Sequence, residues 1–274
     1  MNSELLMLSA ILFFISGLLL RMINLGKISS NLQAVGWCFF GFYWFITRQF
    51  STTSSLWIVI LAQFMGVISF YIAYKVWNKN EAGLEKLTYG FLIMALIYGS
   101  FVFFEALNLI LLEYTTYNVS FALDFIGIPH ELSGNLIVLK HQVFTAEIIE
   151  ACTGISAIAF IVGLIHMSEE TFRKKLLGSL IAAILVYVIS IFRLILAIVV
   201  QENMLFEWWP YKGIANSFQF FEEVITPIYV LIATLVVVTY ILKFFPDIED
   251  YFYELAKQMI SDLKDLIQKI ISYI

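Results

Sequence analysis

Apolar residues along this chain gather into long runs that short polar connections separate. A helix needs roughly 20 residues to cross the hydrocarbon core of a bilayer, and backbone there must satisfy its hydrogen bonds internally. The pattern therefore predicts an all-α polytopic membrane protein with about seven transmembrane helices. Their approximate ranges are 4–20, 33–50, 55–77, 88–112, 151–167, 178–201 and 222–245.

A different period follows the last apolar run. From Ile248 to Ile270, apolar residues recur at steps of three and four, with lysine and acidic residues between them. This period predicts a C-terminal amphipathic helix. A position on the cytoplasmic surface of the membrane, or packing against loops, fits its two faces, and a coiled-coil contact between two chains is the alternative.

The spacing of the runs predicts three regions. Residues 1–112 form a four-span N-terminal membrane region with few polar groups inside its spans. Residues 113–245 form a second region, with an outer loop, three spans and nearly all of the unusual polar residues, and this region is expected to carry the function. Within the outer loop, residues 135–139 are typical of a short strand. Residues 246–274 form the cytoplasmic amphipathic helix.

Composition supports the membrane assignment and excludes other classes. Hydrophobic residues make up 61% of the 274 residues and charged residues 14%, whereas soluble domains have about half and about a quarter. The net charge of −5 comes without a basic patch interleaved with aromatics, so nucleic acid is not an expected partner. Two cysteines cannot build a disulfide framework, and three scattered histidines predict neither a metal site nor a cofactor.

Positive charges predict the orientation in the membrane. Arg173, Lys174 and Lys175 lie together in the short connection between the fifth and sixth runs. Because lysine and arginine are enriched in cytoplasmic loops, the N-terminus is predicted outside the cell and the C-terminus in the cytoplasm. Cys152 and Arg193 then both lie toward the outer face of a multi-pass cell-membrane protein.

Cys152 and Arg193 carry the candidate chemistry. Cys152 begins the fifth run in the motif Glu-Ala-Cys-Thr-Gly-Ile, and the first turn of a helix favours a thiolate and a lowered thiol pKa. Arg193 interrupts the sixth run, where a charge costs ~2.5–3.5 kcal/mol unless it faces protein or water. If their helices pack together, the pair predicts a cysteine active site. A buried thiol, and a structural ion pair between Arg193 and a glutamate, are the alternatives.

These motifs resemble the exosortase/archaeosortase family. The resemblance covers roughly residues 115–240 and rests on the cysteine motif within 143–163, on 123–128 followed by Gly134-Asn135, and on 190–193. It implies a polytopic, transpeptidase-like enzyme that processes exported proteins at a C-terminal hydrophobic sorting signal. In the archaeal branch it implies transfer to a membrane lipid. It also implies Cys152 as the nucleophile and Arg193 as its catalytic partner.

The chain departs from this family at the third catalytic position. The family places a histidine or an arginine near the start of the last core span, but no histidine follows His166 and no arginine follows Arg193. Proton transfer then needs another group. The candidates are Glu223, Glu222 and Glu150, with His141 also open.

Two other classes of protein stay open. A membrane transporter would explain many spans and an arginine inside the membrane, although not the cysteine motif. A catalytically inactive assembly protein of the same fold would explain the missing third basic residue. Loss of substrate processing on Cys152→Ala would favour an enzyme over both.

Overall fold

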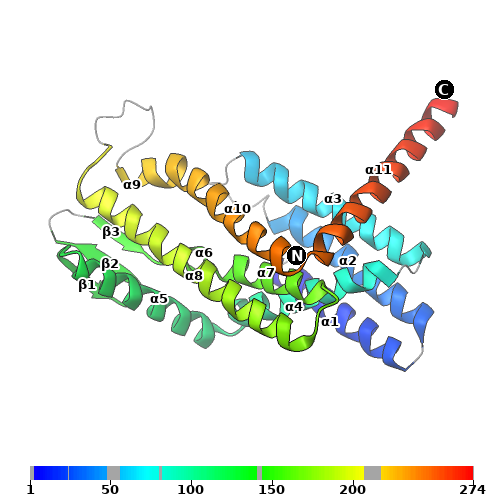
Figure 1. Ribbon diagram of the computed structural model, residues 1–274, viewed down its shortest axis with the longest axis horizontal. Coiled ribbons are helices and arrows are strands. Elements are labelled where there is room, and N and C mark those ends of the chain that lie inside the picture. Colours follow the sequence, from blue (N-terminus) through cyan, green and yellow to red (C-terminus); the bar gives the residue numbers. More distant parts are fainter. Residues whose placement is uncertain are drawn as a thin grey trace. The chain divides into compact units, whose positions relative to one another are not determined.

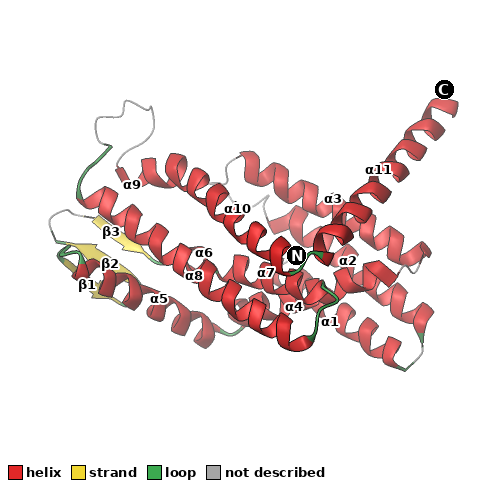
Figure 2. Ribbon diagram, viewed as in Figure 1, coloured by secondary structure: helices red, strands yellow, loops and turns green. Residues whose placement is uncertain are grey.

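The computed structural model describes residues 3–23, 25–47, 56–79, 82–140, 144–206 and 217–273, and most of them are helical (Figures 1 and 2). Within these ranges, four helical stretches are long and apolar enough to cross a membrane. They lie in α1 (Ser3–Met22), α4 (Ala82–Phe103), α8 (Phe172–Glu202) and the continuous stretch Ser217–Phe244. The prediction of an all-α membrane protein is confirmed, and the count of seven spans stays a prediction.

Two of the predicted runs are interrupted. The run 88–112 breaks at Phe104, whose extended backbone (φ −109°, ψ 93°) separates α4 from α5 (Glu105–Phe125). The run 151–167 breaks at Gly154, between α6 (Glu150–Thr153) and α7 (Ile155–Met167). Part of the predicted outer loop is therefore helix, because α5 carries an apolar face that includes Leu112, Val119 and Leu123.

The chain forms two compact units, which are described separately. The first contains residues 1–99, 163–169 and 250–274, and the second contains residues 100–162 and 170–249. The sequence-based boundary at residue 112 stays a prediction. Cys152 and Arg193 both belong to the second unit, so the geometry between them is internal to one compact body.

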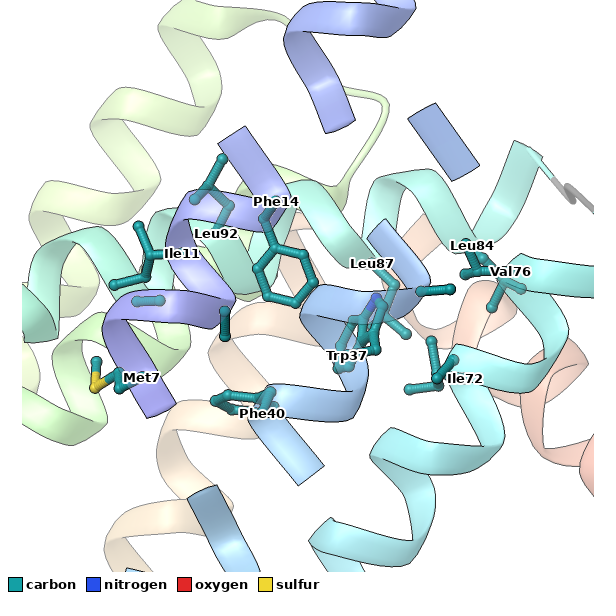
Figure 3. Packing of buried hydrophobic residues seen from close by; sticks show 14 of the residues in the cluster. Met7, Ile11, Phe14, Trp37, Phe40, Ile72, Val76, Leu84, Leu87 and Leu92 are labelled. Atoms are coloured by element: carbon teal, nitrogen blue, oxygen red, sulfur yellow. The ribbon is translucent and has the colours of Figure 1, made fainter. Parts of the chain in front are cut away.

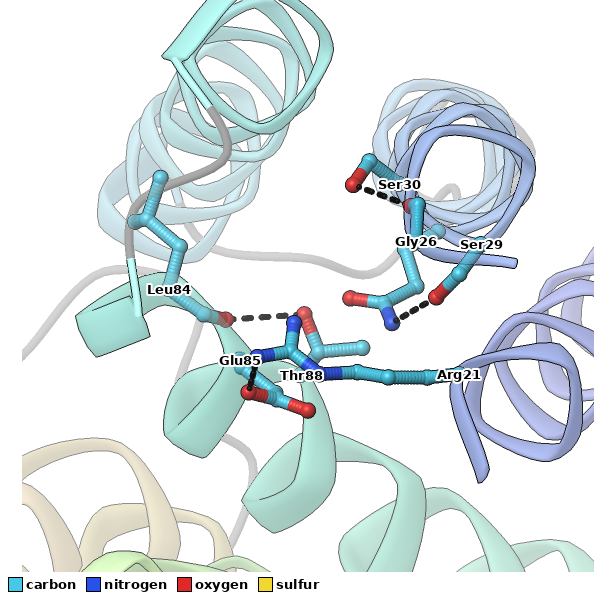
Figure 4. A network of polar contacts seen from close by, with 8 residues as sticks. Arg21, Gly26, Ser29, Ser30, Leu84, Glu85 and Thr88 are labelled. Carbon is cyan, nitrogen blue, oxygen red and sulfur yellow. Dashed lines mark hydrogen bonds and ion pairs between the residues drawn. The ribbon is translucent and has the colours of Figure 1, made fainter. Parts of the chain in front are cut away.

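The first unit is held by an aromatic core. Trp37 of α2 (Gly26–Thr47) is 0% exposed and packs edge-on against Phe14 and Phe91 (Figure 3). Its indole Nε1 donates to Thr88 Oγ1 at 2.9 Å, so the buried polar atom is satisfied. Arg21, in the last turn of α1, forms an ion pair with Glu85, in the first turn of α4, at 2.6 Å (Figure 4).

The C-terminal amphipathic helix is confirmed as α11 (Asp247–Tyr273). It is tied to α3 (Leu56–Lys79) by Asp262, which pairs with Lys75 at 2.5 Å and accepts a hydrogen bond from the Tyr71 hydroxyl at 2.7 Å. Lys75 is only 3% exposed, so this contact compensates a buried charge. Its predicted place on the membrane surface stays a prediction.

The second unit contains a small antiparallel sheet. Its strands are β1 (His130–Ser133), β2 (Leu136–Leu139) and β3 (Phe144–Glu147), in the order β1-β2-β3. Strand β2 corresponds to the predicted strand. Alternate residues of β2 and β3, continuing to Ile148, face a core shared with α5 and α8, which lie side by side (Figure 1). This packing fixes where β3 ends and α6 begins.

Candidate active site

Cys152 lies in α6, immediately after the sheet. Ile148 anchors the connection: its N–H donates to the Asn135 carbonyl at 2.9 Å, and its own carbonyl accepts from Asn135 Nδ2 at 3.0 Å. Ile148 is buried in the core of the second unit, and the half-buried Cys152 packs on the same core. The thiol is free. The sheet and its core therefore hold the cysteine in place.

Gly154 brings α6 against α8. Its φ of 76° lies in the left-handed region that favours glycine, and it ends α6. A Cβ at this position would lie 2.3 Å from Ser190 Oγ, so the glycine directly abuts α8. Ser190 precedes Arg193 by about one helical turn, on the same side of the helix. This close approach explains how two distant motifs meet.

Arg193 lies at the Cys152 thiol. Its side chain is within hydrogen-bonding and electrostatic reach of the sulfur, and its buried Nε has no hydrogen-bond partner among the described residues. Tyr229 of α10 (Thr226–Phe244) donates to the Ile189 carbonyl at 2.7 Å and interacts electrostatically with Arg193. The predicted meeting of cysteine and arginine is present, and the guanidinium keeps unused donor capacity there.

We expect Gly154→Ala to disturb the site through backbone strain and a clash with Ser190. A left-handed alanine costs about 1–2 kcal/mol before the clash is counted, so the melting temperature should fall and substrate processing with it. Ser190→Ala in the same chain should restore part of the stability, because it removes the clashing oxygen but not the strained φ. Thermal unfolding of the two variants in detergent measures this, and equal stability of wild type and Gly154→Ala would contradict the assignment.

The three candidate carboxylates lie in different surroundings. Glu222 and Glu223 belong to η1 (Phe221–Ile225), a π-helical turn between α9 (Ser217–Phe220) and α10; such turns are frequent at functional sites. The charge of Glu222 acts on the Cys152 thiol. Glu223 is exposed and accepts a hydrogen bond from Gln219 Nε2 at 2.8 Å. Glu150 is half-buried in the first turn of α6.

Other contacts hold the turn that carries Glu222. The buried Gln201 of α8 accepts a hydrogen bond from the Phe218 backbone N–H at 2.8 Å. The ring of Phe218 contacts that of Phe144 in β3, with 5.0 Å between the ring centroids. The turn is therefore fastened to both α8 and the sheet. His141 lies outside the described residues, and among the described residues no group of His, Cys, Asp and Glu is placed to hold a metal ion.

Burial raises the pKa of the Cys152 thiol, and the nearby Glu222 charge raises it further. A hydrogen bond from the Ile149 backbone and the Arg193 guanidinium lower the thiol pKa without offsetting burial. Cys152 precedes α7 and lies outside the four candidate spans. The sequence-based expectation of a lowered pKa was wrong, because burial of the thiol outweighs the groups that favour the thiolate.

Alkylation of Cys152 should therefore depend steeply on pH. The thiolate is the reactive form, so the iodoacetamide rate in a Cys38→Ser background should keep rising above pH ~8.5, the pKa of an unperturbed thiol. At neutral pH, Glu222→Gln should speed alkylation, because it removes a charge that raises the pKa. Arg193→Gln should slow it. A plateau reached below pH ~8 would show a depressed pKa instead.

Comparison with protein-family models matches residues 1–243 to the transmembrane exosortase family. Neither the curated proteins nor the solved structures compared with the chain gave a match. The family match includes both halves of the candidate site, Cys152 in α6 and Arg193 in α8. Because it covers most of the sequence, the chain belongs to the transmembrane exosortase family, whose membership supports a transpeptidase-like role in protein sorting at the membrane.

Proposed function

We propose that this protein is an intramembrane cysteine peptidase or transpeptidase that cleaves the C-terminal sorting signals of exported surface proteins. The meeting of Cys152 with Arg193 is the observation that carries the proposal. A half-buried thiol beside a guanidinium whose Nε–H is unbonded among the described residues is suited to nucleophilic attack on a carbonyl. The test is mass analysis of a co-expressed exported protein that ends in a hydrophobic segment, with cleavage before that segment expected.

The reaction divides into two acyl-transfer steps. The Cys152 sulfur attacks the scissile carbonyl carbon, the C–N bond breaks, and the C-terminal hydrophobic fragment leaves as an amine. The remaining protein is then a thioester on Cys152. A lipid amine or hydroxyl, or water, attacks that thioester and regenerates the thiol. Transfer to lipid and hydrolysis are distinguished by the mass of the product.

Arg193 supplies electrostatic stabilisation in both steps. It cannot serve as a general base, because a guanidinium keeps its proton in proteins. Its hydrogen bonds instead favour the thiolate and the oxyanion that forms when sulfur adds to the carbonyl. The Arg193 Nε–H supports this role, since it is a donor that no described residue uses.

Glu222 is the proposed proton-transfer group. The raised pKa of Cys152 leaves the resting site with a protonated thiol, so the attack needs a base. A carboxylate can accept that proton and give it to the leaving amine. The electrostatic interaction with Cys152 supports Glu222 over the exposed Glu223, whose carboxylate is bonded to Gln219. Glu150, two residues before the nucleophile, is the remaining candidate.

Glu222→Gln should lower the rate of processing by about 10²-fold, the usual loss for a general acid–base. Glu223→Gln should lower the rate of processing by less than about threefold, because the Glu223 side chain is solvated. Single-turnover processing by the two variants and by Glu150→Gln ranks the three carboxylates. A large loss in Glu223→Gln with normal processing by Glu222→Gln would reverse the assignment.

We also propose that the site lies at the outer face of the cell membrane. The basic residues 173–175 stand at the start of α8, which supports a cytoplasmic start for this span. Arg193 lies 21 residues after Phe172, or about 30 Å along the helix. Arg193 therefore lies toward the outer side of the membrane. In this orientation the N-terminus is outside and the C-terminus is in the cytoplasm.

An inactive assembly protein of the same fold is the second candidate. The lack of a histidine or arginine after Arg193 favours this candidate. The exosortase/archaeosortase family, which the chain resembles, carries a catalytic base or cation at that third position. The two candidates differ in one observable result. An assembly protein would keep its role in Cys152→Ala, whereas the enzyme would lose processing.

A further inference from the structure

Strand β3 is an edge strand, and its register shows which backbone groups face outward. The sheet order is β1-β2-β3, with β3 at one end (Figure 2). In the antiparallel pairing with β2, the Ile148 N–H donates to the Asn135 carbonyl. Because inward and outward positions alternate, residues 144, 146 and 148 bond toward β2. The N–H and C=O groups of Thr145, Glu147 and Ile149 therefore face away from the sheet.

The outward groups of β3 are open within the described part of the chain. No other strand pairs with β3, and no backbone hydrogen bond reaches Thr145 or Glu147 from the outer side there. The side chains of both residues are exposed as well. A row of unpaired amides and carbonyls is a template on which an extended peptide can add as a further strand.

This open edge leads to the nucleophile. Ile149 is the next outward-facing position after Glu147, and its backbone hydrogen-bonds the Cys152 sulfur. The N–H is the donor, because this contact favours the thiolate, which can only accept. The edge thus runs from Thr145 past Glu147 and ends beside the thiol.

We propose that this edge of β3 binds the substrate segment that precedes the scissile bond, in extended form, as an added strand. The inference rests on the proposed peptidase function and names how its substrate is held. Backbone pairing at Thr145 and Glu147 places the following peptide carbonyl level with Ile149 and within reach of Cys152. The Ile149 N–H can then donate to the oxyanion together with Arg193.

The substrate segment before the scissile bond, and not the hydrophobic segment after it, is the one that can pair with β3. The hydrophobic segment after it uses its backbone hydrogen bonds within a transmembrane helix, so it has none to offer a strand. The preceding segment has a free backbone. It runs from the exported protein toward the scissile bond, and β3 runs toward Cys152 in the same sense. The added strand is therefore parallel to β3.

Proline substitutions test the edge. Thr145→Pro and Glu147→Pro each remove one outward N–H and leave the bonds to β2 intact, as proline on an edge strand can. Each should raise KM about fivefold to tenfold, the value of one net hydrogen bond. The matched control is Leu132→Pro, which removes an outward N–H from β1, at the opposite edge of the sheet. Leu132 is exposed, and its substitution should leave KM unchanged.

Disulfide crosslinking gives a second, independent measurement. In a Cys38→Ser, Cys152→Ala background, Thr145→Cys or Glu147→Cys is combined with single cysteines placed along the substrate before its cleavage point. A paired strand predicts crosslinks at every second substrate position. Moving the enzyme cysteine from 145 to 147 should shift the pattern two residues toward the scissile bond. Crosslinks without this period would overturn the proposal, whatever the KM values show.

Different results would contradict the peptidase function and the binding of substrate at the β3 edge. If Cys152→Ala still processes the substrate, the peptidase function itself is wrong. If Cys152→Ala abolishes processing while the two β3 prolines behave like Leu132→Pro, the function stands and the edge is not the binding site. Periodic crosslinks together with raised KM in the β3 prolines support both.

Discussion

Cys152→Ala is expected to abolish processing of the exported substrate, with a loss on the order of 10³-fold or more, as for other catalytic nucleophiles. The reason is chemical, since no other group in the site can form the thioester. The protein should remain folded, because the thiol is half-buried and alanine adds no polar group to the core. Processing is measured from the mass of the substrate C-terminus at matched enzyme levels.

Cys38→Ser is the matched control for this result. Cys38 packs against the aromatic core of the first unit, in a body separate from the candidate site. Its substitution should leave the rate of processing within about twofold of wild type. Hydroxylamine added to the wild type should release substrate as a hydroxamate, which requires a thioester, and Cys152→Ala should give none. Normal processing by Cys152→Ala would exclude the cysteine mechanism.

Arg193→Gln is expected to slow the chemical step by about 10²–10³-fold, the usual effect of removing one oxyanion donor. The loss should appear in kcat more than in KM, because the hydrogen bonds to the oxyanion form only in the transition state. Arg193→Lys should recover part of the rate through its charge, although it lacks the planar fork of the guanidinium. Single-turnover rates at saturating substrate separate the two parameters.

Stability distinguishes catalysis from a structural role for Arg193. The buried Nε of Arg193 has no partner within the described part of the chain, so Arg193→Leu should not lower the melting temperature. Arg173→Gln, at the exposed start of the same helix, is the matched control and should process substrate normally. A large fall in the melting temperature of Arg193→Leu with only a small loss of rate would indicate a structural ion pair instead.

The two proposals for Glu222 and for the edge of β3 bear on the same question, how a site with a protonated thiol becomes reactive. Glu222 removes the proton, and a bound strand places the carbonyl where the Ile149 N–H and Arg193 both donate. Binding of substrate also excludes water, which strengthens these interactions. The protein would then activate its thiol only when substrate is present.

The sequence by itself determined the membrane class and the C-terminal helix, and it singled out Cys152 and Arg193 as residues that would form a site if their helices pack together. These follow from local signals: the length of apolar runs, the period of apolar positions, and an arginine where charge is costly. The short strand at 135–139 was also predicted. Strands β1 (His-Glu-Leu-Ser) and β3 (Phe-Thr-Ala-Glu) were not predicted, because neither has the continuous apolar run that marks β2 (Leu-Ile-Val-Leu).

Only the tertiary structure decided the rest of the site. The break at Gly154 depends on the close approach of Ser190, a residue far along the chain. The proposed choice of Glu222 over Glu223 rests on their different surroundings in a π-helical turn, where the direction of successive side chains departs from the α-helical period. The thiol pKa was judged from one helix end, but burial by α8 and the core outweighs that effect. Burial, register and close approach are sums over distant parts of the chain, so a local pattern cannot contain them.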